Sequence, residues 1–183
     1  MPTPTETCFL DVIIERRPLD NPWKDHTWTI VAVQMGEKVQ GSSVWTEVPD
    51  ETLSEGVTRY RISGLAVELF RKETEGYKVN LSQPAAQVYV VLRANEDEEA
   101  GQDIEVFHVT VCPYEAEGYA ESGDETVEGV PMPDELKALV QTFIDSHHVE
   151  VPFKKRKRKD HDPRKGEAVR AAPRAGPRAA PGR

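Results

Sequence analysis

The sequence has little of several features that mark particular classes of protein. It contains only two cysteines in 183 residues, Cys8 and Cys112, which are too few for a disulfide framework and lack CxxC spacing. No run approaches the roughly 20 apolar residues of a membrane span, and the first residues have no basic region of a secretory signal. These absences predict a cytoplasmic protein.

Motifs for the common chemistries are also missing. There is no GxGxxG or GxxxxGK(S/T) phosphate loop and no GxSxG nucleophile turn. His108 and Cys112 are four residues apart, which on a strand separates them by about 13 Å, too far to share a metal ion. We therefore expect no bound metal and no cofactor, and the residues favour a non-catalytic protein over an enzyme.

Basic residues are absent from one long segment. The 43 residues between Arg93 and Lys137 contain 14 acids and no Lys or Arg, whereas residues 154–183 hold 12 of the 23 bases. The net charge of −9 is thus the sum of −18 on residues 1–153 and +9 on residues 154–183. We expect the acidic segment to make one side of the domain negative, which attracts basic partners and repels nucleic acid.

The C-terminal residues have too few apolar side chains to fold. Residues 154–183 contain no aromatic residue and one large aliphatic, Val169, so we predict a disordered basic Ala/Pro/Arg tail over 153–183. It begins with a basic docking segment: Lys154, Lys155, Arg156, Lys157, Arg158 and Lys159. Nucleic acid, an anionic membrane, an acidic partner protein and the domain's own acidic side are all possible targets, and the two protein targets together are favoured.

What remains is a domain over residues 6–152, preceded by a flexible N-terminus at 1–5. Alternating apolar residues predict strands at 8–16, 28–34, 58–63, 65–70, 87–93 and 105–112, with Gly64 as a bend between two of them. The fold class is mainly β, an antiparallel sandwich or small barrel of six or more strands. One C-terminal amphipathic helix is predicted at about 133–147, because Leu136, Val140 and Phe143 recur at helical spacing.

Two segments between the strands combine aromatic and charged residues. NPWKDHTW enters one strand and FRKETEGYKVNL follows another, and loops of this composition are common binding positions. With two residues of HVTVCPYEAEGY, the candidate binding residues are Trp23, His26, Trp28, Arg71, Glu73, Tyr77, Asn80, Tyr114 and Glu115. The alternative is structural, in which the Trp rings plug the end of a sheet and Asn80 makes a turn.

The same segments carry a resemblance to a known family. ERRPLDNPWKDHTW, LFRKETEGYKVNLSQPAAQVYVVLR, HVTVCPYEAEGY, the VPMPDEL helix start and the PFKKRKRK ending resemble a bacterial family known as a domain of unknown function. The resemblance covers most of residues 9–159. Members of that family are typically encoded among the genes of molybdenum or tungsten formate dehydrogenases, which implies an accessory or maturation role.

Together these features predict a non-catalytic accessory or assembly protein that binds a partner polypeptide. The resemblance implies that the partner is formate dehydrogenase or a neighbouring maturation factor. Two alternatives stay open: a nucleic-acid-binding protein that acts through the basic tail, and a small-molecule-binding β-barrel.

Overall fold

The computed structural model describes residues 5–41, 43–95 and 101–149. Within them lie seven strands: β1 (Glu6–Pro18), β2 (His26–Met35), β3 (Val44–Glu47), β4 (Thr58–Leu69), β5 (Gln87–Ala94), β6 (Ile104–Thr110) and β7 (Thr126–Pro131). The helices are the 3-10 turn η1 (Arg71–Glu73), α1 (Thr74–Leu81), α2 (Pro113–Ser122) and α3 (Asp134–His147). The predicted tail, its basic segment and, apart from Thr5, the predicted flexible N-terminus lie outside the described residues.

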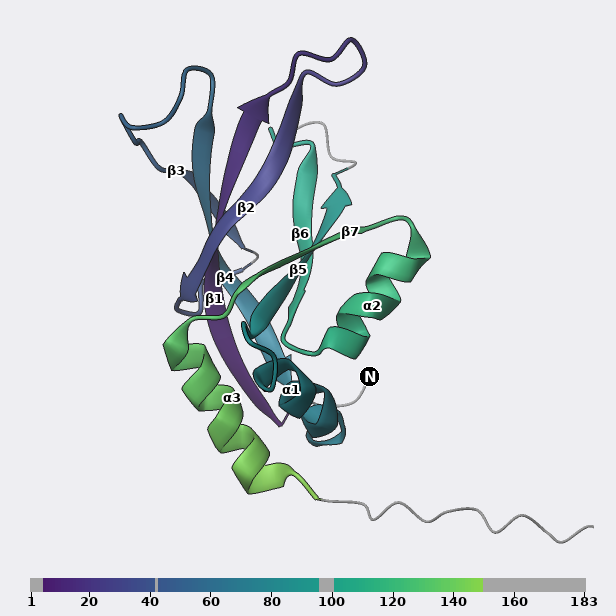
Figure 1. The fold of residues 1–183 in the computed structure, drawn as a ribbon. Helices are drawn as coiled ribbons and strands as arrows, with labels where there is room; N and C mark the ends of the chain where they lie inside the picture. The colour runs from purple at the N-terminus through teal and green to yellow at the C-terminus, as the bar shows by residue number, and fades with distance from the viewer. Residues whose placement is uncertain (1–4, 42, 96–100, 150–183) are drawn as a thin grey trace, which may run out of the picture. The chain divides into compact units, whose positions relative to one another are not determined.

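The strands form two antiparallel sheets (Figure 1). One has the order β2-β1-β4-β3 and the other β6-β5-β7, with β2 beside β7 and β4 beside β6. At the β2–β7 seam the Ile30 backbone N–H donates to the Glu128 carboxylate at 3.1 Å. The prediction of six or more antiparallel strands in a mainly β fold is confirmed. The barrel alternative is wrong, because the two sheets do not close into one through a backbone ladder.

The core lies between the sheets and follows from the alternation of side chains along the strands. Leu10, Val12 and Ile14 of the central strand β1 are completely buried, as the sequence predicts. Val88 and Val90 of β5 meet them from the other sheet in the same hydrophobic cluster. Burying this much apolar surface is the main force that holds the two sheets together.

The predicted division into two strands at Gly64 is wrong. The strands expected at 58–63 and 65–70 are one continuous strand, β4, which pairs along the whole of β1. Leu10 pairs with Leu65 and Val12 with Ile62, so Ser63 and Gly64 both stand opposite one residue of β1. This is a β-bulge, and Gly64 can form it because its φ of 82° lies in the left-handed region.

The prediction of one helix is also incomplete. The helix expected at 133–147 is confirmed as α3, whose buried residues Leu136, Val140 and Phe143 face the core. However, 70–81 is not a loop but η1 and α1, and α2 covers the outer face of the smaller sheet. None of the helices in the described ranges is long and apolar enough to cross a membrane.

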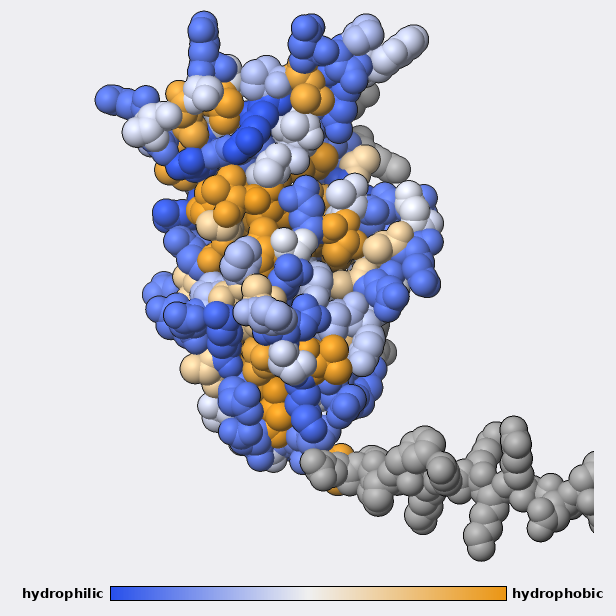
Figure 2. Space-filling view, viewed as in Figure 1, coloured by the Kyte–Doolittle hydropathy of each residue, from blue (hydrophilic) through white to orange (hydrophobic). Residues whose placement is uncertain are grey.

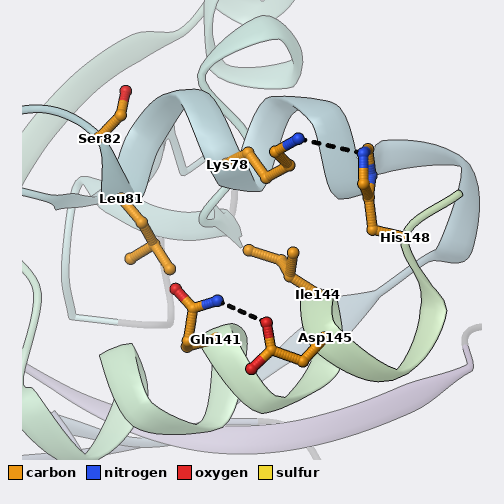
Figure 3. Close-up of a pocket in the computed structure, with 7 residues that line it drawn as sticks. All are labelled: Lys78, Leu81, Ser82, Gln141, Ile144, Asp145 and His148. Carbon is orange, nitrogen blue, oxygen red and sulfur yellow. Dashed lines mark hydrogen bonds between the residues drawn. The ribbon is translucent and has the colours of Figure 1, made fainter. Parts of the chain in front are cut away.

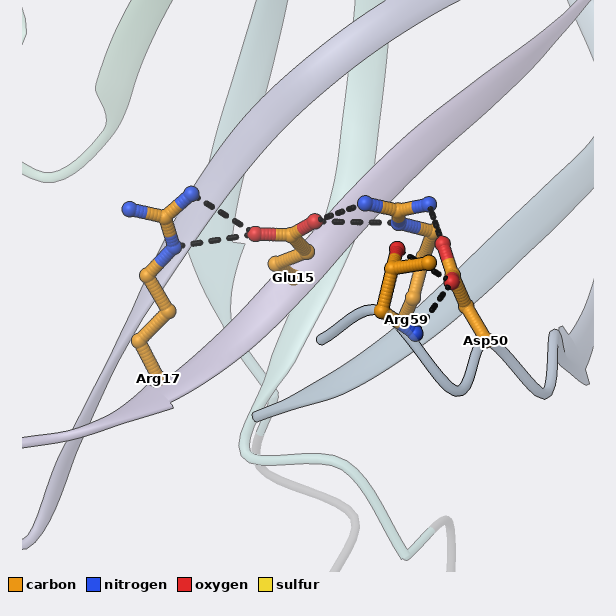
Figure 4. Close-up of polar contacts among 5 residues, drawn as sticks. Glu15, Arg17, Asp50 and Arg59 are labelled. Atoms are coloured by element: carbon orange, nitrogen blue, oxygen red, sulfur yellow. Dashed lines mark hydrogen bonds and ion pairs between the residues drawn. The ribbon is translucent and has the colours of Figure 1, made fainter. Parts of the chain in front are cut away.

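A charged network stabilises the outer face of the larger sheet (Figure 4). Glu15 of β1 is 3% exposed, and its two carboxylate oxygens accept hydrogen bonds from Arg17 and Arg59 at 2.6–2.9 Å. Arg59 also pairs with Asp50, which joins the β3–β4 loop to the network. Burial by itself would raise the pKa of Glu15, but the hydrogen bonds from the two arginines outweigh it and hold that pKa below its usual range.

The Glu15 network predicts a loss of stability in acid. A carboxyl whose pKa is lower in the folded than in the unfolded chain stabilises the fold above the unfolded pKa of about 4.5, and this contribution is lost as the pH falls through the folded pKa. Urea unfolding of Glu15→Gln between pH 7 and pH 3 should therefore show a smaller fall in free energy than the wild type. Glu47→Gln, on the exposed edge strand β3, should follow the wild type. A Glu15→Gln profile parallel to the wild type would contradict this.

The bulge predicts a position-specific effect of adding a methyl group. Gly64→Ala should destabilise the fold by roughly 1–3 kcal/mol, because of its positive φ and because its Cβ would meet the Val39 side chain. Gly118→Ala is the control, since this exposed α2 position has open space around it. The substitution should raise the free energy of unfolding by about 0.5–1 kcal/mol. Urea unfolding midpoints measure both changes. Equal effects of the two substitutions would show that the bulge imposes no constraint.

Candidate functional site

A cleft of about 520 Å³ lies where α1 meets the beginning of α2. Both helices leave the same end of the sandwich, α1 after β4 and α2 directly after β6 (Figure 1). The residues that line the cleft are Lys72, Glu73, Glu75, Gly76, Cys112, Tyr114 and Glu115. Three of them, Glu73, Tyr114 and Glu115, are among the predicted binding residues.

The buried side chain of Asn80 connects the elements that form this cleft. Its Nδ2 donates to the carbonyl oxygens of Gln87 at 2.7 Å and Val111 at 2.8 Å, and its Oδ1 accepts from the Gln87 N–H at 2.9 Å. Asn80 is completely buried, so these bonds replace contacts with water. They tie α1 to the start of β5 and to the strand end that leads into α2.

A glycine allows the two walls of the cleft to approach closely. A Cβ on Gly76 would lie 2.7 Å from the Cys112 Sγ and 3.2 Å from the Tyr114 ring. Gly76 is buried in α1, where glycine costs about 1 kcal/mol relative to alanine. This cost is accepted because only the absence of a side chain lets α1 pack against the Cys112–Tyr114 segment.

On the α1 side, Glu73 is held in place by two neighbours. The Tyr77 hydroxyl donates to Glu73 Oε2 at 3.1 Å and itself accepts from the Phe70 N–H at 3.1 Å. Lys72 Nζ lies 3.6 Å from Glu73 Oε1. Tyr77 is buried, and burial raises its pKa, so it stays a neutral donor. Glu75 projects beside Glu73, and its side chain is 68% exposed.

On the α2 side, Glu115 contacts His108 of β6, with Nε2 and Oε1 separated by 3.3 Å. The hydrogen bond from His108 lowers the pKa of Glu115 and outweighs the opposing effect of burial. Glu115 is therefore ionised at neutral pH. With Glu73 and Glu75 it gives the cleft three carboxylates against a single lysine.

The remaining two lining residues have contrasting exposure. Cys112 is 2% exposed, and burial raises the pKa of its thiol, so it is protonated at neutral pH and is not a nucleophile. Tyr114 is 55% exposed at the rim of the cleft. An accessible phenol ring beside carboxylates can stack on an arginine or lysine side chain. The cleft is thus suited to binding a cation rather than to covalent chemistry.

The structure divides the nine predicted residues between the two ends of the sandwich. Trp23, His26 and Trp28 lie at the β1–β2 turn, at the opposite end of β4 and β6 from the cleft (Figure 1). Trp23 is 92% exposed, whereas Trp28 is buried. Trp28 plugs this end of the core together with Trp45 and Tyr60, whose rings lie 5.7 Å from its own.

The acidic segment reaches both ends. Asp103, directly before β6, accepts a hydrogen bond from Trp28 Nε1 at 2.8 Å and lies 3.1 Å from His26 Nε2. Burial opposes ionisation of Asp103, but these partners outweigh it and hold its pKa below the usual range. Asp103 therefore links the β1–β2 turn to the smaller sheet, whereas Glu115 lines the cleft at the other end.

The other predicted residues near the cleft have different positions. Arg71 is exposed on η1 and does not line the cleft, and Tyr77 and Asn80 lie behind its wall. The predicted binding residues leave out four residues that line the cleft: Lys72, Glu75, Gly76 and Cys112. The sequence gives little indication of them, because no motif identifies a glycine and a cysteine in separate segments that come into contact in the fold, as Gly76 and Cys112 do. No group of three or more His, Cys, Asp or Glu in the part of the chain that the structure describes could hold a metal ion.

The position of Asn80 predicts a large effect of its removal. Asn80→Ala removes the partner of one buried and two part-buried backbone groups, and a buried group left unpaired costs roughly 1–3 kcal/mol, so we expect a loss of about 3 kcal/mol in the free energy of unfolding. Asn21→Ala is the matched control, because Asn21 accepts one hydrogen bond from the Trp23 N–H in an exposed turn. Urea unfolding measures both variants, and similar losses would refute a special role for Asn80.

Comparisons with known proteins give one match. No curated protein and no solved structure is significantly similar to this chain. A family model, described as "Protein of unknown function (DUF3305)", matches residues 9–157. This range agrees with the extent of the resemblance noted in the sequence. Because the match spans most of the chain and includes every residue of the cleft, the protein belongs to this family of unknown function.

Proposed function

We propose that this protein is a non-catalytic cytoplasmic accessory protein that binds a partner polypeptide, and that the cleft between α1 and α2 receives a basic segment of that partner. The observation that carries the proposal is the charge of the cleft. Glu73, Glu75 and Glu115 surround it, and Lys72 is the one base among the lining residues. Such a site attracts cationic side chains and discriminates against acidic ones.

The shape and exposure of the cleft support a peptide as the ligand. Its volume of about 520 Å³ lies within the usual range of ligand sites. Glu75 and Tyr114 are accessible, so a chain that crosses the surface can engage both without entering the core. Tyrosine is frequent among the residues that dominate binding energy at protein interfaces. An arginine or lysine side chain over Tyr114 would place its charge near Glu115.

The partner is proposed from the resemblance. Members of the family that the chain resembles are typically encoded among formate dehydrogenase genes. We therefore propose that the basic segment belongs to a formate dehydrogenase subunit or to a neighbouring maturation factor. We propose that the basic docking segment at 154–159 binds an acidic protein surface, either of a partner or of the domain itself, because its six side chains are all positively charged.

The test is co-purification of the full chain with co-expressed formate dehydrogenase subunits and maturation factors. The triple variant Glu73→Gln, Glu75→Gln and Glu115→Gln keeps the side-chain shapes and removes three charges. Its affinity for the captured partner should fall by about threefold to a hundredfold, since each of the three exposed charge pairs contributes roughly 0.2–1 kcal/mol. The control triple removes three exposed carboxylates from or beside β3: Glu47, Glu51 and Glu55.

Three results would count against the proposal. The control triple could weaken binding as much as the cleft triple, or the cleft triple could bind as the wild type does. Alternatively, the full chain could bind duplex DNA or RNA with an affinity that drops steeply with salt and vanishes when residues 154–183 are removed. That last result would favour the nucleic-acid alternative, whose basis is the run of six bases at 154–159.

A further inference from the structure

A second hollow, separate from the cleft, lies between α1 and α3 (Figure 3). This groove has a volume of about 500 Å³ and is lined by Lys78, Leu81, Ser82, Gln141, Ile144, Asp145 and His148. Leu81 and Ile144 point into it from the two helices and provide an apolar floor. Figure 2 shows hydrophobic residues at the surface between these helices, with hydrophilic residues on both sides.

One end of the groove carries a lysine without a carboxylate partner. Lys78 is half-buried, and its Nζ lies 3.1 Å from His148 Nε2. In the described part of the chain, no carboxylate oxygen lies within 4 Å of this ammonium. Glu75 is the nearest acid on α1, and it lies 3.7 Å from His148 instead. A partly desolvated charge of this kind favours an anionic ligand.

The contact with His148 does not neutralise Lys78, because an imidazole side chain carries no negative charge. The Thr74 hydroxyl donates to the Arg71 carbonyl oxygen at 3.1 Å, so it accepts from His148 Nδ1–H at 3.0 Å. His148 Nε2 is then unprotonated and accepts from Lys78. The imidazole therefore orients the ammonium toward the groove, where no carboxylate among the described residues pairs with it directly.

The α3 wall offers acceptors. Gln141 Nε2 donates to Asp145 Oδ1 at 2.8 Å, and both residues are exposed, so Gln141 Oε1 and Asp145 Oδ2 can accept further hydrogen bonds. Ser82 donates its hydroxyl hydrogen to the Val79 carbonyl oxygen and keeps its lone pairs. These groups suit backbone N–H donors. An alkyl chain that covers them would displace their water without supplying donors in its place.

We propose that the α1–α3 groove binds a peptide segment of a partner protein in which an acidic residue precedes large apolar residues. The carboxylate pairs with Lys78, an apolar side chain fills the space between Leu81 and Ile144, and backbone N–H groups donate to Gln141 and Asp145. This site takes the opposite charge to the α1–α2 cleft, and it does not depend on the function proposed for that cleft.

The experiment is a titration of the full chain, labelled with nitrogen-15, with the peptide Ac-Glu-Leu-Leu-NH2, followed by amide chemical shifts. Shifts should be concentrated at Lys78, Leu81 and Ile144. Ac-Gln-Leu-Leu-NH2, which lacks the charge, should bind about tenfold more weakly, because a hydrogen bond between two charged groups is stronger than one to a neutral amide. Sodium octanoate, which has the carboxylate and an alkyl chain but no N–H donors, should also bind more weakly.

Variants separate the charge of Lys78 from general effects. Lys78→Gln should lower the affinity for the acidic peptide about tenfold, and Lys78→Arg should retain the wild-type affinity. Lys137→Gln is the matched control, since Lys137 pairs with Asp134 at the other end of α3 and should bind as the wild type. The proposal would be overturned if the two peptides bound equally well or if Lys78→Gln bound the acidic peptide as tightly as the wild type does. Chemical-shift changes that lie outside the groove would also overturn it. Octanoate binding without peptide binding would assign the groove to small carboxylates instead.

Discussion

The buried amide of Asn80 is the interaction on which the arrangement of this protein's surface sites depends. Its three hydrogen bonds join α1 to Gln87 at the start of β5 and to Val111 at the end of the strand before α2. Apolar packing holds the two sheets together but does not specify where a short polar helix lies against them. A buried polar group with fixed partners does, because any displacement of α1 would leave those partners unpaired.

The position of α1 gives it two different neighbours. On one side it meets the Cys112–Tyr114 segment, with Gly76 at the point of closest approach, and the cleft there is acidic. On the other side it packs against α3, where Tyr77 contacts Phe143 edge to face and Lys78 faces the groove. One eight-residue helix thus presents negative charge to one hollow and positive charge to the other. The same helix therefore lines both proposed sites, whose charges differ.

The fold was largely predictable from the sequence and the sites were not. Strands with alternating apolar residues, such as β1 and β5, and the helix α3 were found because each buries one periodic face. The helix α1 was missed because its buried residues include Thr74, Gly76 and Asn80, which carry no apolar periodicity. Glu73, Tyr114 and Glu115 were selected by composition, but nothing local showed that two distant segments share one cleft.

The sequence alone determined the β-rich class, the division into an acidic part and a basic C-terminal part, and the family. These properties follow from residue types and their spacing, which local chain geometry translates directly into strands, charge and motifs. Only the tertiary structure decided that Trp28 fills the core while Trp23 is exposed, and that the aromatic turn and the cleft lie at opposite ends of the sandwich. Those facts depend on contacts between residues far apart in the chain, whose pairing is set by the packing of the whole domain.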